Sequence, residues 1–300
     1  MFNHILTPLD GSQLAEAAVP VAVKLAQQLP ATLTLFHVVE HNAPASIHGE
    51  PHLTTHDAAQ AYLADVIARL VPAALAVAPH VHSNPTPDVA QSIVDHAEEL
   101  QVDLIVMCSH GGNSLQKRLF GSIAQKIIAL GITPVLLVNP EQVTAAFRCR
   151  RLLVTLDGDP DHEHGLTTAV TLAQQCQAQL HLVMVVPTLD TLSPAQSATG
   201  RLLPQATAAL LDAREAGARD YLQDKCAEQA ESGLTLTCEV RRGDPAATIV
   251  AAAADEDIDL IVLGTHGKLH MDAFWSGSVT PKLAAEARWP LLLAPVRDRD

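Results

Sequence analysis

Short, mostly apolar runs alternate along the chain with longer segments in which apolar residues recur every three or four positions. The first pattern is typical of buried strands and the second of amphipathic helices, so their alternation predicts βαβ units around a parallel sheet. In the first half we expect strands at His4–Leu9, Thr32–Val39, Val77–His82, Leu104–Met107 and Val135–Val138, and helices near Gln13–Gln28, Asp57–Leu75, Val89–Leu100 and Ser122–Leu130. In the second half we expect strands at Arg151–Leu156, Gln179–Val186, Thr235–Arg241, Leu260–Leu263 and Leu291–Ala294, and helices near Glu163–Gln175, Gln205–Glu231, Pro245–Glu256 and Val279–Ala287. Pro20 and Pro72 lie inside two helical patterns and should kink those helices or move their ends.

The second half of the chain repeats the first. The segment VDLIVMCSHG, which begins at Val102, aligns without a gap with IDLIVLGTHG, which begins at Ile258. The halves also start alike, with HILTPLDG in the first and RLLVTLDG in the second, and each carries a later Gly-Ser pair. We therefore predict a tandem duplication with domains at 1–142 and 149–300. The extra residues of the second half should lie within 187–204.

Composition and charge narrow the range of functions. The chain is 48% hydrophobic and 17% charged, as expected of a globular protein, and its formal net charge is -14. That charge opposes phosphate backbones and anionic lipids, so we expect neither nucleic acid nor membrane as a partner. The five cysteines show no CxxC spacing, which argues against a disulfide framework or a Cys-rich zinc site. Without a signal-peptide pattern or a long apolar run, the expected location is the cytoplasm.

Glycine-rich strand exits in the second half form the candidate binding site. Ligands of open α/β sheets bind beyond the carboxyl ends of the strands, where the strand order reverses. Asp157–Gly158 leaves the first strand of this half, where a carboxylate can hold ribose hydroxyls or a cation. Gly264–Gly267 leaves the fourth strand, and Gly277–Ser278 opens the next helix. Such glycines let backbone amides approach phosphate oxygens, and a helix N-terminus adds unpaired N–H groups.

An Asp-Gly strand exit followed by Gly-x-x-Gly, nine residues and Gly-Ser at a helix start resembles the universal stress protein family, and the resemblance covers nearly the whole chain twice. It implies two tandem Rossmann-like domains of the adenine nucleotide α hydrolase-like type, each a five-stranded parallel sheet in the order 3-2-1-4-5 flanked by helices. Many family members bind ATP with a divalent metal, so the implied ligands are ATP and Mg²⁺. Members usually pair through their last strands. The resemblance thus implies an intrachain pseudo-dimer through Val135–Val138 and Leu291–Ala294, and leaves a further homodimer open.

The resemblance places the nucleotide mainly in the second half, where the motif is complete. The implied contacts there are Asp157, Val185, Gly264, His266, Gly267, Gly277, Ser278, Val279 and Thr280. The matching positions of a weaker site in the first half are Asp10, Val38, Gly111, Gly121 and Ser122. Cys108 replaces the first motif glycine of that half. Because its side chain falls where the nucleotide needs close backbone approach, we expect the first half to bind less well.

No catalytic constellation accompanies the motif. Ser278 and His266 could serve as nucleophile and base, yet no Gly-x-Ser-x-Gly elbow is present, and a phosphate-binding serine is the better interpretation. We therefore expect a stress-response protein that acts through nucleotide-dependent binding, with at most slow hydrolysis. Two alternatives stay open: a nucleotide-using enzyme such as an adenylyl transferase on a related fold, and an interaction module that binds no nucleotide.

Histidines and a cysteine are the remaining candidates for chemistry. Four histidines follow the second strand of the first half: His41, His48, His52 and His56. Gly49 and Pro51 interrupt the helix that would align them, so we expect solvated loop histidines and no metal site. Cys108 lies at a strand end, where we expect a buried and unreactive thiol.

Overall fold

The structure, a computed structural model, describes residues 1–109, 121–140, 147–192, 198, 202–265 and 279–295. The first half contains β1 (His4–Pro8), α1 (Gln13–Glu16), α2 (Val19–Gln28), β2 (Thr32–Glu40), β3 (Ser46–Ile47), β4 (Glu50–Pro51), α3 (His56–Leu70), β5 (Val77–Thr86), α4 (Val89–Glu99), β6 (Leu104–Cys108), α5 (Ser122–Leu130) and β7 (Val135–Val138). The second half contains β8 (Arg151–Leu156), η1 (Pro160–His162), α6 (His164–Cys176), β9 (Gln179–Val186), η2 (Leu189–Thr191), α8 (Pro204–Glu228), η3 (Ala230–Ser232), β10 (Leu236–Arg242), α9 (Pro245–Asp255), β11 (Leu260–Thr265), α11 (Val279–Glu286) and β12 (Leu291–Pro295).

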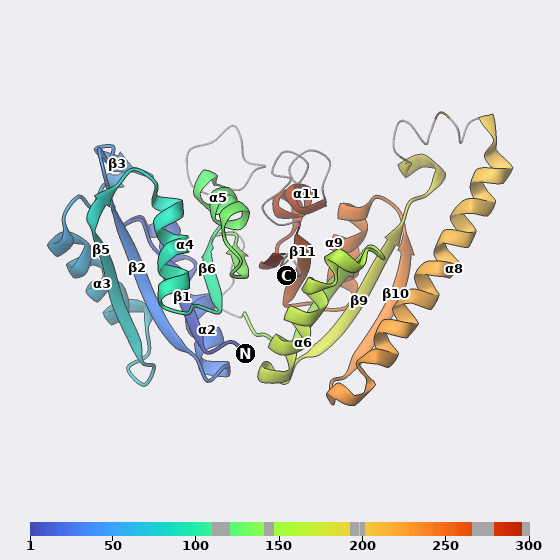
Figure 1. The fold of residues 1–300 in the computed structure, drawn as a ribbon, viewed down its shortest axis with the longest axis horizontal. Helices are drawn as coiled ribbons and strands as arrows, with labels where there is room; N and C mark the ends of the chain where they lie inside the picture. The colour runs from blue at the N-terminus through green and yellow to red at the C-terminus, as the bar shows by residue number, and fades with distance from the viewer. Residues whose placement is uncertain (110–120, 141–146, 193–197, 199–201, 266–278, 296–300) are drawn as a thin grey trace.

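One continuous sheet of ten strands runs through both halves, in the order β10-β9-β8-β11-β12-β7-β6-β1-β2-β5. Within each half the neighbouring strands are parallel and follow the order 3-2-1-4-5. One face of the sheet packs against α2, α3, α6 and α8, and the other against α4, α5, α9 and α11 (Figure 1). The predicted α/β fold, including the strand order that the resemblance implied, is confirmed.

The halves meet edge to edge through their last strands. β7 and β12 pair in the antiparallel direction, with Leu136 opposite Leu292. These two leucines enter the core on one face of the sheet, whereas Leu137 and Leu293 enter the core on the other. Both cores contain residues from both halves, so each core is continuous across the junction. The intrachain pairing expected from the resemblance is therefore present.

Two matched hydrogen bonds tie each half to the other. The backbone N–H of Phe2 donates to Gln175 Oε1 at 2.7 Å, and that of Cys149 donates to Gln28 Oε1 at 3.2 Å. Cys149 follows Phe2 by 147 positions, and Gln175 follows Gln28 by the same 147. The duplication therefore produces one hydrogen bond twice, once in each direction across the junction.

Replacing either glutamine with leucine should lower the free energy of unfolding by about 1 kcal/mol, because a half-buried N–H loses its acceptor. Gln28→Leu and Gln175→Leu should have similar effects, since duplication relates the two bonds. Chemical denaturation measures the difference. Gln27→Leu changes an exposed neighbour on α2 and should stay within about 0.5 kcal/mol of wild type. A loss in only one of the two variants would contradict the paired role.

Prolines set two helix ends, as the sequence indicated. Pro20 lies in the first turn of α2, and the predicted single helix is divided into α1 and α2. α3 ends at Leu70 because Pro72 disfavours helical geometry at the preceding residue. The β3–β4 hairpin was not predicted. It turns at His48 and Gly49, whose φ values of +50° and +88° fit a two-residue turn with two left-handed residues.

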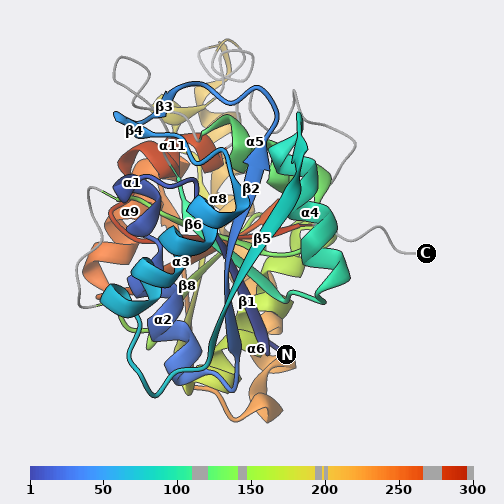
Figure 2. The same cartoon turned by 90° about the vertical axis from the view of Figure 1, so that its left-hand side faces the viewer.

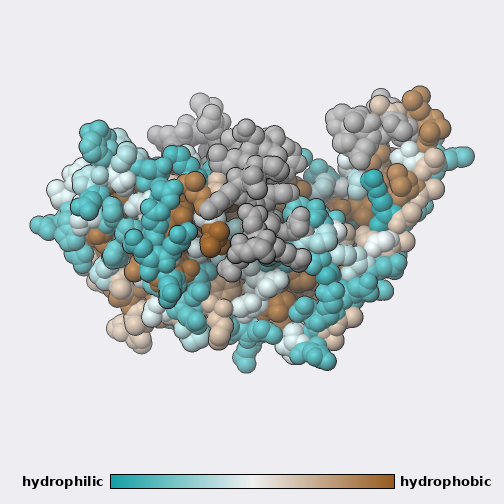
Figure 3. All heavy atoms as spheres, viewed as in Figure 1, coloured by the Kyte–Doolittle hydropathy of each residue, from teal (hydrophilic) through white to brown (hydrophobic). Residues whose placement is uncertain are grey.

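Apolar side chains are exposed at the start of α8. Leu202 is 80% exposed and Leu203 is 59% exposed, and Figure 3 shows hydrophobic surface at this upper right end of the molecule. Most other coloured surface in that view is hydrophilic. Within the described ranges, no helix is long and apolar enough to cross a membrane.

Candidate functional site

The first strand of each half leads into an Asp-Gly turn of the same geometry. Gly11 and Gly158 have φ values of +96° and +85°, in the left-handed region that favours glycine. Asp10 Oδ1 accepts the backbone N–H two residues ahead at 2.9 Å, and Asp157 Oδ1 does the same at 3.0 Å. Each turn therefore holds a carboxylate beyond the carboxyl end of the first strand.

A side chain has no room at Gly264, near the end of β11. A Cβ at this position would lie 2.3 Å from the carbonyl oxygen of His162, and a Cβ on Gly165 would lie 2.7 Å from the Gly264 nitrogen. The two glycines thus allow η1 and the start of α6 to pack directly on the strand. This packing also positions Asp157, whose Oδ2 lies 2.6 Å from His162 Nδ1.

The described part of the second-half site lies where the strand order reverses. β8 has β9 on one side and β11 on the other. Asp157 follows β8, Val185 is half-buried near the end of β9, Gly264 is in β11, and Val279 and Thr280 begin α11. These ends of neighbouring strands form the location where ligands of open α/β sheets bind. His266, Gly267, Gly277 and Ser278 lie outside the described residues.

In the first half, the matching location is a cavity of about 310 Å³. Four residues of the predicted weaker site line it: Asp10, Val38, Gly121 and Ser122. The fifth, Gly111, lies outside the described residues. Figure 2 shows the carboxyl end of β2 and the neighbouring β3–β4 hairpin at the top of this half. The structure therefore groups these four residues around one space.

Cys108 lines this cavity without filling it. Its Sγ donates to the carbonyl oxygen of Leu14 at 3.0 Å and lies 3.6 Å from that of Ala15. The sulfur thus points at α1, the part of the first half that corresponds to η1 of the second. Burial raises the pKa of the Cys108 thiol to about 12, so the thiol stays protonated, in line with the expected unreactive cysteine.

Three histidines line the same cavity: His37, His48 and His52. His48 Nε2 lies 3.6 Å from Asp10 Oδ2, and His52 Nε2 lies 3.7 Å from Glu40 Oε2. The expectation of solvated loop histidines is wrong for His52, whose side chain is only 4% exposed. The β3–β4 hairpin folds this loop back over β2, which is why the histidine is buried. Among the described residues, no group of three or more His, Cys, Asp or Glu side chains is arranged to hold a metal ion.

His37 was not singled out from the sequence. It interrupts the apolar run of β2 between Phe36 and Val38. A polar residue within an otherwise apolar strand could have identified it, because such residues are rarely buried without a hydrogen-bond partner.

Family and sequence comparisons match both halves. The model of the universal stress protein family matches residues 1–139 and again residues 148–295. A universal stress protein of Mycolicibacterium smegmatis is 25% identical over 313 residues, covering 98% of this chain and 97% of that protein. Universal stress protein YxiE of Bacillus subtilis is 30% identical over 155 residues, covering 46% of this chain and 100% of the relative.

Solved structures agree with the fold across both halves. The crystal structure of a universal stress protein from Archaeoglobus fulgidus has a TM-score of 0.66 at 17% identity, and covers 99% of this chain and 100% of its own. The crystal structure of a putative universal stress protein from Pseudomonas aeruginosa has a TM-score of 0.62 at 19% identity. The match covers 98% of this chain and 93% of that chain. At these identities the likeness concerns the fold.

Proposed function

Because the chain belongs to the universal stress protein family, with a family match in each half, we propose that it is a stress-response protein that binds ATP in its second half. The observation that carries this proposal is the tight packing at Gly264. Gly264 lies so close to the carbonyl oxygen of His162 that there is no room for a side chain at this position. The glycine lets η1 lie against the end of β11, and this packing holds the Asp157 carboxylate at the strand exit, where ligands of open α/β sheets bind.

The other motif residues supply the remaining contacts in this proposal. The adenosine lies beside Asp157 and Val185. Asp157 directly follows β8, and Val185 is near the end of the neighbouring β9. The phosphates, with Mg²⁺, lie beside Gly267, Gly277 and Ser278, and the first turn of α11 at Val279 and Thr280 adds N–H groups and a favourable dipole. His266 belongs to the same loop in the sequence and offers a basic side chain.

A binding role accounts for these residues better than a catalytic one. Asp157 accepts hydrogen bonds from the backbone of Asp159 and from the ring of His162, which hold it as a fixed acceptor. A general base must instead be free to take a proton from water. We therefore propose at most slow hydrolysis, with the bound nucleotide read by a partner molecule.

Isothermal titration of ATP and Mg²⁺ into the full chain tests the proposal. We expect about one ATP per chain, and Gly277→Val should lower the affinity about 100-fold, equal to about 2.7 kcal/mol. Gly121→Val is the matched control, since Gly121 precedes Gly277 by 156 positions and occupies the same place in the first half. It should leave this binding event unchanged.

Three outcomes would overturn the proposal. Absence of ATP binding to the wild type would indicate an interaction module instead. Loss of binding in Gly121→Val and not in Gly277→Val would place the site in the first half. Steady-state turnover of about 1 per second or more would indicate a nucleotide-using enzyme.

A further inference from the structure

Four of the five cysteines meet in two pairs, both in the second half. The Cys149 thiol donates a hydrogen bond to the thiol of Cys176, and the Cys226 thiol donates one to that of Cys238. All five cysteines are free thiols in the structure. Two thiols in hydrogen-bond contact need only a small approach to reach the S–S bonding distance of about 2.05 Å. Each pair is therefore a candidate site of oxidation.

The first pair lies at the junction between the halves. Cys149 comes just before β8, and its backbone N–H donates to Gln28 of the first half at 3.2 Å. Cys176 ends α6 and directly follows Gln175, which accepts the backbone N–H of Phe2. Figure 1 shows the N-terminus between α2 and α6. Each cysteine thus takes part in, or directly follows, one of the two matched hydrogen bonds across the junction.

The first half has no thiols at the equivalent positions. Phe2 precedes Cys149 by 147 positions, and Leu29 precedes Cys176 by the same 147. Phe2 and Leu29 are both 4% exposed and belong to the core. Two ordinary apolar side chains therefore satisfy the packing at this place, and packing alone does not require a pair of cysteines in the second half.

The two thiols of this pair differ in their readiness to react. Donating the hydrogen bond to Cys176, together with burial, raises the pKa of the Cys149 thiol well above its usual value. Accepting that hydrogen bond lowers the pKa of the Cys176 thiol, although its partial burial acts in the opposite direction. Cys149 is 0% exposed, whereas Cys176 is half-buried. Because the thiolate is the nucleophile, an oxidant from solvent meets Cys176 first, with Cys149 beside it.

We propose that Cys176 and Cys149 react with hydrogen peroxide and close a disulfide at the junction of the two halves. The Cys176 thiolate attacks one oxygen of the peroxide, the O–O bond breaks, and the sulfur becomes a sulfenic acid. The departing hydroxide takes up the proton that Cys176 released. Cys149 then attacks the Cys176 sulfur, and the Cys149 proton leaves with the sulfenic hydroxyl as water. In sum, two thiols and one peroxide give one disulfide and two waters.

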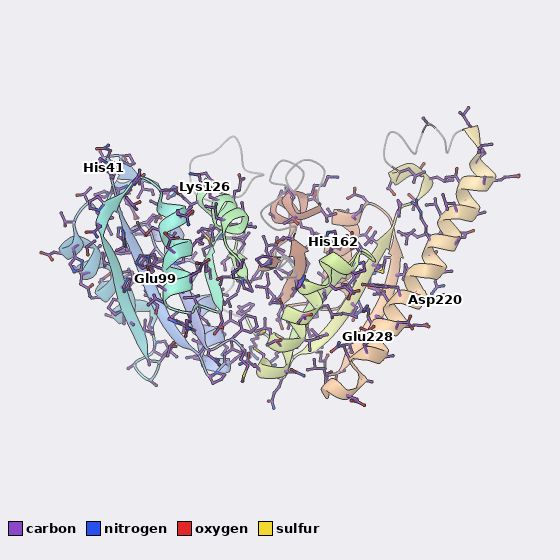
Figure 4. All side chains as sticks on the ribbon, viewed as in Figure 1. His41, Glu99, Lys126, His162, Asp220 and Glu228 are labelled. Carbon is purple, nitrogen blue, oxygen red and sulfur yellow. The ribbon has the colours of Figure 1, made fainter. Side chains whose placement is uncertain are left out.

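The second pair provides a comparison within the same chain. Cys226 lies near the end of α8, next to Glu228 (Figure 4), and Cys238 lies in β10, at the end of the sheet farthest from the junction. Burial, with the hydrogen bond to Cys238, raises the pKa of the Cys226 thiol to about 12. This donor thiol stays protonated, and Cys226–Cys238 should be oxidised more slowly than the junction pair.

Peroxide treatment of the reduced full chain tests the proposal. The reaction is stopped by alkylation at successive times, and disulfides are located by peptide mass spectrometry. The first oxidation should lower the number of free thiols from five to three per chain. The Cys149–Cys176 disulfide should form about tenfold faster than any other. It should raise the urea midpoint of unfolding by about 1 M, because it restricts the unfolded chain, and dithiothreitol should reverse the shift.

Variants separate the roles of the two cysteines. In Cys149→Ala the sulfenic acid of Cys176 has no resolving thiol, so dimedone should trap it there and much less in wild type. In Cys176→Ala the buried Cys149 should stay reduced. Cys238→Ala removes the other pair, and this control should form the junction disulfide at the wild-type rate. The mapping of the wild type decides the matter if a junction variant does not fold.

Three results would overturn the proposal. The first is a wild type in which peroxide leaves Cys149 and Cys176 reduced. The second is a Cys226–Cys238 disulfide that forms before the junction disulfide. The third is equal dimedone labelling of Cys176 in wild type and in Cys149→Ala, which would show that Cys149 does not resolve the sulfenic acid.

Discussion

Replacing Gly264 with alanine should lower the free energy of unfolding by about 3 kcal/mol, the upper part of the range for overpacked sites. The added Cβ would lie 2.3 Å from the carbonyl oxygen of His162 and 3.2 Å from its carbonyl carbon. Both are backbone atoms, so no side chain can rotate to relieve the clash. Urea denaturation should show a lower midpoint with an unchanged slope, since the same surface is exposed on unfolding.

Gly217→Ala is the matched control. Gly217 lies on the exposed side of α8, and a Cβ there would meet no atom within 4 Å. Alanine is the better helix former, so this variant should gain up to about 1 kcal/mol. A wild-type midpoint for Gly264→Ala would contradict the close packing of η1 on β11.

The Gly264→Ala substitution also links stability to the proposed ligand site. Relief of the clash must move His162, whose ring is hydrogen-bonded to Asp157. A shift of this turn would displace the carboxylate proposed to lie beside the adenosine. We therefore expect the folded Gly264→Ala variant to bind ATP more weakly because the turn at Asp157 has moved. Gly277→Val differs in this respect, since it leaves that turn in place.

Most of the fold could be predicted from the repeated pattern of the sequence. Alternating strand and helix patterns located the main elements, and the family resemblance carried by the shared motif implied the order of the strands in each half. The hydrogen bonds of Gln28 and Gln175 across the junction could not be predicted from the sequence. The two glutamines occupy equivalent positions, but equivalence alone does not say that each contacts the other half. That fact depends on the antiparallel pairing of β7 and β12.

The candidate site was only partly visible in the sequence. Gly264 was identified as a point of close backbone approach, whereas its contact with His162 depends on the path of the chain after β8. His37 lies in a strand buried on both faces, where alternation gives no information about which side a residue faces. His52 is buried by a hairpin whose strands have two residues each, too few to produce a recognisable pattern.

The junction between the halves should be the most sensitive part of the core. Leu292→Ala should lower the free energy of unfolding by about 4 kcal/mol, within the range for fully buried leucines. Leu292 is 0% exposed and lies opposite Leu136, which is 1% exposed. Strands on both sides hold the backbone in place, so the space left by the side chain can collapse only partly. Leu136→Ala should cost a similar amount, and the double variant less than the sum, because both changes open the same space.

Because each core is shared, damage at β12 should destabilise the first half as well as the second. Far-UV circular dichroism follows both halves. Tryptophan fluorescence follows the second half, because both tryptophans of the chain, Trp275 and Trp289, belong to it. The two unfolding curves of Leu292→Ala should coincide and shift together. Leu210→Ala, at a leucine 52% exposed on α8, is the control and should change stability by no more than about 0.5 kcal/mol. Separate transitions for the two signals would show that each half folds on its own, which would contradict a core that spans the junction.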